Sequence, residues 1–266
     1  MSSSRRVLRA YAYGVALAMA LPILITVPGA VTTTGYMTFP PVGFTLTWFT
    51  RAFRDAALME SLARSVSLAA LSALVAVALG LPASFAVQRH QFRGRDLVET
   101  LFAGPQMVPQ IILVLGLLIF YQAIGLGSSF FGLLMSHVAI GLPFAFRTLL
   151  ASVATLDRRL EWSAQLLGAN RAQVLWRVIL PQVKTGILAA LIFTFMISFT
   201  NFTMALFLSG GGRTTLPVEM FNRLYVAGMT PAIPALSFLL GLFGFLMFIL
   251  IDRTIGVYKY LGGGGQ

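Results

Sequence analysis

Residues 161–181 read EWSAQLLGANRAQVLWRVILP, a polar and basic island between long apolar segments. Within it, Gly168 is typical of the position just after a helix, where a residue with a left-handed backbone ends the helical turn. Asn170 is typical of the residue that begins a helix, and Gln173 follows three residues later, as in a capping box. The stretch therefore predicts two short helices with a break between Gly168 and Asn170.

The first of these helices carries one apolar stripe. Leu160, Ala164 and Leu167 are spaced four and three residues apart, so they share one face of a helix. A helix this short is marginal on its own. We therefore expect it to pack against something, either the apolar helices of its own chain or a soluble partner.

The composition of the whole chain is that of a membrane protein. Of its 266 residues, 58% are hydrophobic and only 10% are charged, whereas about 25% of a soluble domain is charged. Such a chain cannot cover a soluble globule with polar surface, so we predict an all-α integral membrane protein. The net charge of +11 indicates basic cytoplasmic loops and no nucleic-acid partner. The absence of cysteine excludes disulfides and thiolate metal sites.

Apolar runs of about 20 residues are long enough to span a bilayer as helices. We predict six transmembrane helices, at about residues 11–31, 65–88, 100–123, 130–150, 185–208 and 233–251, in a single domain that covers residues 1–266. The basic start of the first run resembles a signal peptide, but its length favours an uncleaved helix. Gly104, Pro105 and Pro109 predict a kink or break at the start of the third helix.

The loops between these helices differ in charge. With both chain ends in the cytoplasm, fourteen of the 19 lysine and arginine residues lie in cytoplasmic segments and five in external ones. Membrane proteins collect basic residues in cytoplasmic loops, so we predict cytoplasmic N- and C-termini. The same orientation places residues 157–181 in the cytoplasm and predicts a short interfacial helix near Trp48 in the first external loop.

No set of residues predicts catalysis. His137 follows Ser136 in the fourth predicted helix, which raises the alternative of an intramembrane serine hydrolase, but no Gly-x-Ser-x-Gly motif accompanies it. A buried histidine that bonds to a neighbouring helix is the simpler interpretation. Metal ligands at useful spacing are also missing, so we expect neither a catalytic nor a metal site.

Transport is the remaining class of function. Ion-coupled secondary transporters usually need ionisable residues inside the membrane, and the predicted helices have no acid in their centres. Neutral polar residues could line a pathway, although each could instead form a hydrogen bond between helices. The candidates for a translocation pathway are Gln106, Gln110, Ser198, Thr200, Asn201 and Thr203.

The cytoplasmic island resembles a known motif. Gly168 is followed after nine residues by the aliphatic Val178, then by Leu180 and Pro181. This spacing resembles the EAA loop of the permeases of binding-protein-dependent ABC importers. Trp162 stands where that family has its glutamate, and Glu161 lies one residue earlier. Either Glu161 supplies the charge from about 100° round the helix, or Trp162 replaces the ion pair with apolar burial.

The resemblance implies a function. It implies the fold of a type I ABC importer permease in the bacterial inner membrane, with a short coupling helix in a groove of an ATPase. The residues that it assigns to ATPase coupling are Glu161, Trp162, Ser163, Ala164, Gly168 and Ala169.

The implied partners are an ATPase dimer that holds ATP and Mg, a second permease subunit, an external binding protein and membrane lipid. The chain has no phosphate-loop motif of its own, so we expect it to bind no cofactor and to hydrolyse no ATP.

The resemblance is greatest to the spermidine/putrescine permease branch, through the N-terminal segment and the first external loop. It implies a small polar solute, polyamine-like or a related organic ion. The alternative from the residues alone is a secondary transporter or channel without an ATPase.

Overall fold

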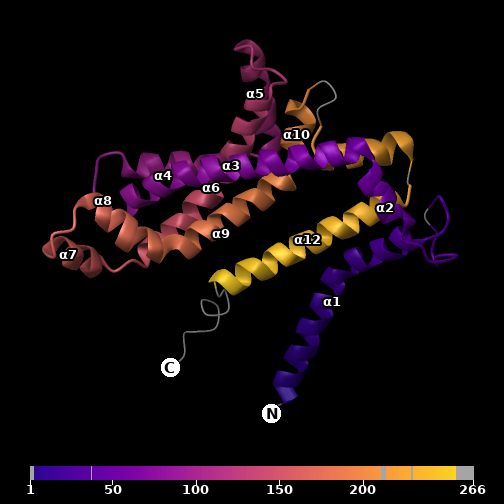
Figure 1. The fold of residues 1–266 in the computed structure, drawn as a ribbon, viewed down its shortest axis with the longest axis horizontal. Helices are drawn as coiled ribbons and strands as arrows, with labels where there is room; N and C mark the ends of the chain where they lie inside the picture. Colours follow the sequence, from indigo (N-terminus) through magenta and orange to yellow (C-terminus); the bar gives the residue numbers. More distant parts are fainter. Residues whose placement is uncertain (1–2, 37, 211–213, 229, 256–266) are drawn as a thin grey trace. The chain divides into compact units, whose positions relative to one another are not determined.

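The computed structural model describes residues 3–36, 38–210, 214–228 and 230–255 (Figure 1). Apart from one isolated bridge between Thr32 and Phe44, these residues form helices and loops. The α-helices are α1 (Ser3–Val31), α2 (Thr47–Arg54), α3 (Ala56–Arg89), α4 (Arg95–Ala103), α5 (Gln110–Ala123), α6 (Phe130–Ala154), α7 (Arg158–Leu166), α8 (Arg171–Val174), α9 (Leu180–Phe199), α10 (Thr203–Leu208), α11 (Leu216–Asn222) and α12 (Ala232–Ile255). One 3-10 helix, η1 (Gly104–Met107), and two π-helical turns, η2 (Leu175–Ile179) and η3 (Arg223–Ala227), complete this part of the chain. The all-α prediction is confirmed.

The chain forms two compact units. One comprises Met1–Glu60 and Glu219–Leu246, and the other comprises Ser61–Val218 and Met247–Gln266. The first contains α1 and α2, and the second contains α4 to α10. The prediction of a single permease domain over residues 1–266 stays a prediction.

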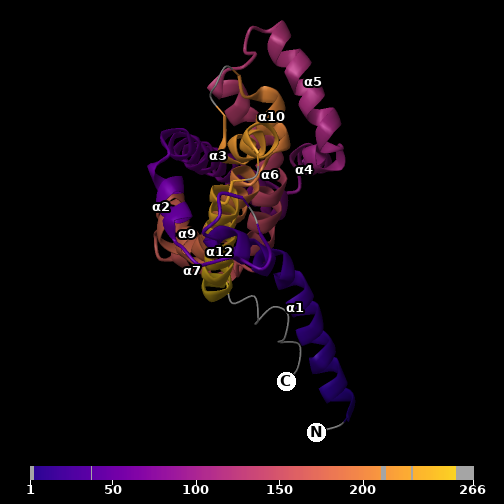
Figure 2. The ribbon, with the colours of Figure 1, turned by 90° about the vertical axis from the view of Figure 1, so that its right-hand side faces the viewer.

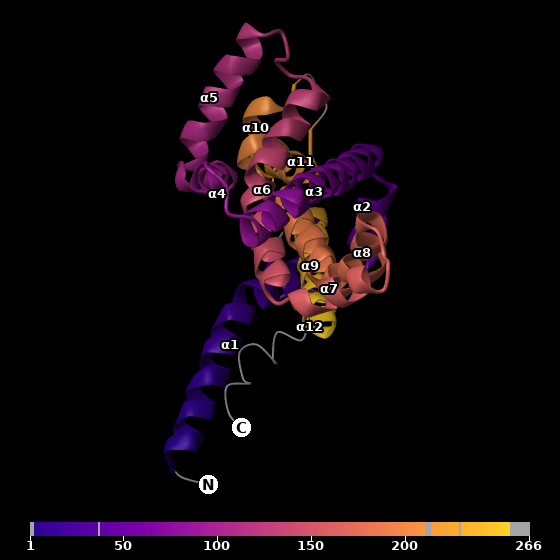
Figure 3. The same ribbon diagram turned by 90° about the vertical axis from the view of Figure 1, so that its left-hand side faces the viewer.

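The core of the larger unit is the packing of α6 against α9. Small residues allow this close approach: a Cβ at Gly141 would lie 2.5 Å from Cγ2 of Thr194, and one at Gly186 would lie 2.2 Å from Oγ of Ser152. Small residues at crossing points let membrane helices pack by van der Waals contact without a hydrophobic driving force. At one end of this pair lie α7 and α8 (Figure 3), and beyond the other end α10 packs on α5.

Three helical stretches of the described chain are long and apolar enough to cross a membrane: Ala56–Arg89, Phe130–Ala154 and Arg171–Phe199. A fourth candidate is the pair Arg95–Met107 and Gln110–Ala123, which is bent by 103° (Figure 2). The predicted break at Gly104, Pro105 and Pro109 is therefore confirmed. The count of six helices and the cytoplasmic termini stay predictions. Arg213 and Lys259, which enter the charge count, lie outside the described residues.

The helix around the fifth predicted span has other bounds than the span. The span is predicted over about residues 185–208, whereas the helical stretch begins at Arg171 and ends at Phe199, and α10 follows as a separate helix. The side-chain oxygen of Asn201 accepts a hydrogen bond from the Met204 N–H at 2.9 Å. A new helix start thus lies inside an uncharged stretch, and the hydropathy of that stretch does not reveal it.

The smaller unit contains the predicted interfacial helix. The short helix α2 is held by Trp48, whose Nε1 donates to the Thr32 carbonyl at 2.7 Å, and Arg51 lies over the Trp48 ring at 4.7 Å. After α2, Asp55 accepts hydrogen bonds from both terminal nitrogens of Arg223, at 2.5 and 2.8 Å. These bonds hold the pKa of the Asp55 carboxyl below its usual range.

Candidate functional site

The first helix of the polar island, which is predicted to be cytoplasmic, is α7, and it ends as the sequence predicts. Gly168 has a φ of +87° and follows the last helical turn. The Ala169 N–H donates to the Ala164 carbonyl at 3.0 Å, and the Gly168 N–H donates to the Gln165 carbonyl at 2.9 Å. These two bonds form a Schellman motif, which satisfies carbonyls that the helix end would otherwise leave free.

The second helix begins at the predicted capping box. The Asn170 side chain accepts from the Gln173 N–H, and the Gln173 side chain accepts from the Asn170 N–H, both at 2.9 Å. The helix does not stop at Pro181, however. It continues into α9 through the π-helical turn η2, in which the Leu180 N–H reaches back to the Leu175 carbonyl. Such a wider turn accommodates a residue that cannot donate a backbone hydrogen bond.

The apolar side chains of α7 are turned away from the chain. None of its nine residues is buried, although the helix follows and precedes membrane-spanning segments. The exposed large apolar side chains of α7 and of the residue that follows it, which we call the docking face, are Leu160 at 48%, Trp162 at 59%, Leu166 at 88% and Leu167 at 89%. Of the two alternatives, burial of this face in the chain's own apolar helices has no support among the described residues, because α7 contacts only the neighbouring α8 and η2 appreciably. The alternative of a partner protein stays a prediction.

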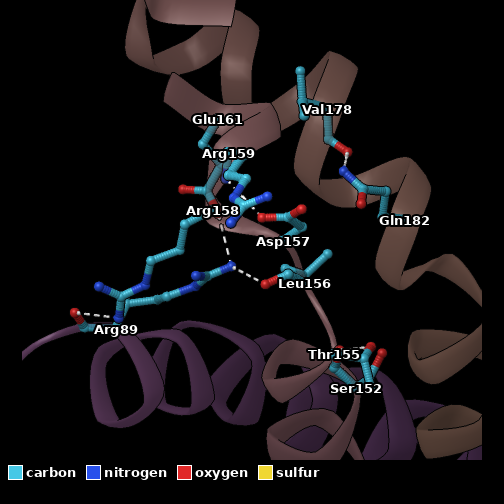
Figure 4. A network of polar contacts seen from close by, with 10 residues as sticks. All are labelled: Arg89, Ser152, Thr155, Leu156, Asp157, Arg158, Arg159, Glu161, Val178 and Gln182. Atoms are coloured by element: carbon cyan, nitrogen blue, oxygen red, sulfur yellow. Dashed lines mark hydrogen bonds and ion pairs between the residues drawn. The ribbon is translucent and has the colours of Figure 1, made fainter. Parts of the chain in front are cut away.

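Glu161 is turned the other way. Its Oε1 lies 2.8 Å from Nη2 of Arg89, the last residue of α3, and the two side chains are only 21% and 11% exposed. Arg89 also donates to the Leu156 carbonyl at 3.3 Å, and Arg158 donates to the Arg89 carbonyl at 3.3 Å (Figure 4). Glu161 is thus paired within the chain, while Trp162 lies on the docking face.

The remaining coupling candidates lie around the same helix. Ser163 is exposed, and Ala164 and Ala169 are half-buried. Arg89 was not among the predicted site residues, because the sequence shows it only as one of several basic residues in a cytoplasmic loop. No local sequence pattern connects Arg89 with the carboxylate of Glu161, which lies 72 positions further along the chain.

Three of the six pathway candidates meet at one cavity. Its volume is about 530 Å³, and Gln106, Gln110 and Asn201 line it together with the break between η1 and α5. Apolar walls come from Leu113, Ile140, Phe144 and Ile197. The described lining residues carry no charge, so the polar contacts available to a solute here are amide groups and backbone atoms.

The other three candidates lie elsewhere. Ser198 is buried, and its hydroxyl lies 2.7 Å from Nδ1 of His137. Thr200 donates to the Met196 carbonyl of its own helix at 2.8 Å. Thr203 begins α10. The structure therefore uses Ser198 and Thr200 for hydrogen bonds within and between helices.

The serine-hydrolase alternative has no support in the geometry. The Ser136 hydroxyl donates to the Gly132 carbonyl at 2.8 Å, and it contacts the Tyr121 hydroxyl at 3.3 Å rather than the adjacent histidine. His137 bonds to Ser198 of α9. The interpretation of His137 as a link between neighbouring helices is confirmed. Among the described residues, no group of three or more histidine, aspartate or glutamate side chains could hold a metal ion.

A second cavity was not predicted. It has a volume of about 500 Å³ and is lined by Arg64, by the apolar residues Leu68, Leu133 and Leu208, and by hydroxyl side chains. The hydroxyl residues are Ser128, Ser129, Ser209 and Thr215. No local pattern in the sequence predicts it, because its lining residues come from segments far apart in the chain.

Comparisons with known proteins agree on one family. Residues 76–256 match the family described as binding-protein-dependent transport system inner membrane component. The chain is 26% identical to the spermidine/putrescine transport system permease protein PotC of Shigella flexneri over 224 residues, which is 84% of each chain. It is 33% identical to a probable molybdenum ABC transporter permease protein of Haloferax volcanii over 193 residues, 70% of this chain and 71% of that one.

A solved structure shares the fold. It is a bacterial ABC transporter involved in the import of the acidic polysaccharide alginate, and it superposes with a TM-score of 0.72 at 17% identity. The superposition covers 95% of this chain and 98% of the other. The predicted fold of an ABC importer permease is confirmed.

Proposed function

The chain belongs to the family of binding-protein-dependent transport system inner membrane components. From this membership we infer a role in ATP-driven import. It is an inner-membrane permease of an ABC importer and a transport subunit rather than an enzyme. We propose that it forms the membrane pathway together with a second, homologous permease. Two ATPases would bind ATP and Mg on the cytoplasmic side, and an external binding protein would deliver the solute.

The docking face of α7 carries this proposal. Burying one leucine side chain is worth about 1.5–3 kcal/mol, and the docking face leaves three leucines and a tryptophan between 48% and 89% exposed. A water-exposed apolar cluster on an otherwise polar loop marks a site for another protein. A groove on an ATPase subunit is the partner that fits a short amphipathic helix. ATP-driven closure of the ATPases would then move α7 and switch the permease between inward- and outward-facing states.

The position of Trp162 decides how this helix docks. The family resemblance places a glutamate there, and such a glutamate would pair with a basic residue of the ATPase. In this chain the neighbouring Glu161 is held by Arg89, whereas Trp162 is 59% exposed on the docking face. We propose that apolar burial of Trp162 replaces the usual ion pair.

The docking proposal is tested by purifying the chain with its ATPase. Trp162→Ala and Leu166→Asp should lose the ATPase, because each removes apolar area that only the complex buries. Phe53→Ala is the matched control, since Phe53 of α2 is also exposed, at 56%, but is predicted to lie on the external side. Retention of the ATPase by both docking-face variants would contradict the proposal, and uptake without any ATPase would favour a secondary transporter.

The solute is proposed to pass the amide-lined cavity. Gln110→Leu keeps the side-chain size but removes its hydrogen bonds, so it should raise the KM of uptake while the ATPase still co-purifies. An unchanged KM would exclude this cavity from the path.

The solute class is proposed from the names of the relatives, and the amide oxygens of the cavity are the groups offered to it. A polyamine-like or related organic ion could donate hydrogen bonds to the amide oxygens of Gln106, Gln110 and Asn201. The relatives' names differ in substrate, so the deciding experiment is a thermal-shift screen of the cognate binding protein. Stabilisation by spermidine or putrescine would support the proposed class, and stabilisation by molybdate alone would refute it.

A further inference from the structure

Arg89 forms an ion pair with Glu161, and among the described residues this is the one ion pair between α3 and the polar island. It is the last residue of α3, and its guanidinium lies 2.8 Å from the Glu161 carboxylate. The contact is an ion pair rather than an aligned hydrogen bond, because Oε1 of Glu161 has no hydrogen-bond partner in the described structure. Both side chains are largely shielded from water, at 11% and 21% exposed, so the pair is screened less than a surface pair.

Two backbone contacts extend this pair along the chain. The Arg89 side chain donates to the Leu156 carbonyl, just before α7, and Arg158 at the start of α7 donates to the Arg89 carbonyl. Figure 4 shows the three contacts converging on the end of α3. We call this group the α3 clamp: Arg89, Leu156, Arg158 and Glu161. It fixes the end of one helix to both the linker and the first turn of another.

The clamp matters because α7 has no buried residue that would fix it to α3. Its main packing contacts are with the neighbouring α8 and η2. Without the clamp, α7 could move while α3 stayed still. The α3 clamp therefore makes α3 and α7 respond together to a force on the docking face.

The middle of α3 packs into the core of the larger unit. Leu68 of α3 packs with Val114, Leu133 and Met204 in a buried cluster, and it also lines the cavity that contains Arg64. Ala76 and Val77 pack in a second buried cluster with α6 and α9. A displacement of α3 is therefore felt by the helices around that cavity, because packed cores transmit strain.

We propose that Arg89 is a positioning residue for energy coupling, through which movement of α7 is passed to α3. The proposal rests on the proposed function, in which an ATPase moves α7. Glu161, at the start of the family's motif, here binds its own chain, and Arg89 completes the coupling machinery from a different loop. Breaking the clamp should leave ATP hydrolysis in place and lower the amount of solute imported per ATP.

The charge-swap experiment tests this pairing. Arg89→Glu and Glu161→Arg should each lower import per ATP by about fivefold or more, as expected for a lost coupling interaction. The double variant restores an ion pair of opposite direction and should recover most of the loss. Arg93→Glu is the control, because Arg93 is exposed in the same loop and changes the charge by the same amount without touching the clamp.

A covalent replacement gives a second test that does not depend on charge. The chain contains no cysteine, so Arg89→Cys with Glu161→Cys creates one reactive pair in the permease. This variant should be poorly coupled when reduced and should regain import per ATP when a short bismaleimide joins the two thiols. A link that leaves import low would overturn the proposal, because the two helix ends would then have to separate during transport.

The outcomes separate the two proposals. Unchanged import per ATP in Arg89→Glu, a double variant as poor as the worse single variant, or loss of the ATPase from Arg89→Glu would each overturn the role of Arg89 in coupling. A wild-type chain that binds no ATPase would instead overturn the proposed function. The readout is solute uptake and phosphate release, both measured on the assembled importer in proteoliposomes.

Discussion

Gly168 is the residue whose replacement gives the most direct measurement of the end of α7. Its φ of +87° is a backbone conformation that costs other L-residues roughly 1–2 kcal/mol. A Cβ added there meets no atom within 4 Å. Gly168→Ala therefore changes only the backbone preference, and its expected cost is this conformational free energy.

The magnitude converts into a measurable rate. A free-energy change of about 1–2 kcal/mol corresponds to a change of about 5- to 30-fold in a local opening equilibrium. The Ala169 N–H, which now donates to the Ala164 carbonyl at 3.0 Å, should exchange with deuterium faster by that factor in Gly168→Ala. Gly168→Asn should show a smaller effect, because asparagine tolerates the left-handed region, and Gly168→Val a larger one.

A matched variant separates backbone strain from general disturbance. Gly116 lies within α5, where an added Cβ also meets nothing within 4 Å and no positive φ is required. Gly116→Ala should leave exchange at Ala169 unchanged and should stabilise α5 by up to about 1 kcal/mol. If Gly168→Ala exchanged like the wild type, the left-handed helix end would not hold in the protein.

Three further predictions concern other parts of the chain. Gly141→Ala places a Cβ 2.5 Å from Cγ2 of Thr194 and should lower the free energy of unfolding by about 1–3 kcal/mol. Adding Thr194→Ser, which removes Cγ2, should restore this free energy. A double variant as unstable as Gly141→Ala alone would refute the contact. The pKa of Asp55 is lowered by Arg223, so the stability that this pair contributes is present above the ordinary value of 3.8 and is lost as the pH falls through the lower folded-state pKa. The difference in melting temperature between wild type and Asp55→Asn should accordingly be constant near neutral pH and shrink below about pH 3.8, and a difference that persists there would contradict the assignment. Asn170→Ala removes the cap of α8 and should cost about 1 kcal/mol of local helix stability, measured as roughly fivefold faster amide exchange in its first turn; unchanged exchange would show that the cap contributes nothing.

The sequence was most informative where the signal is local. The helix end at Gly168 and the helix start at Asn170 could be predicted from the sequence. A left-handed residue and a capping side chain both act within one turn of the chain. The break before α5 could be predicted for the same reason, since proline removes a backbone donor. The different bounds of the helix around the fifth predicted span have the opposite cause. The uncharged stretch continues through residues 200–202, but α9 ends at Phe199, and the Asn201 side chain accepts from the Met204 N–H at the start of α10.

The sequence by itself determined the class of this protein: an all-α membrane chain with a short polar helix, predicted to be cytoplasmic, of the kind found in importer permeases. Composition and spacing carry that information because it depends on totals and on near neighbours. The tertiary structure alone decided which distant residues meet. It joined Glu161 to Arg89, assigned Ser198 to His137, and gathered Gln106, Gln110 and Asn201 around one cavity. Such pairings depend on how the helices pack. The residue pattern of one helix does not show which residues of another helix will lie against it.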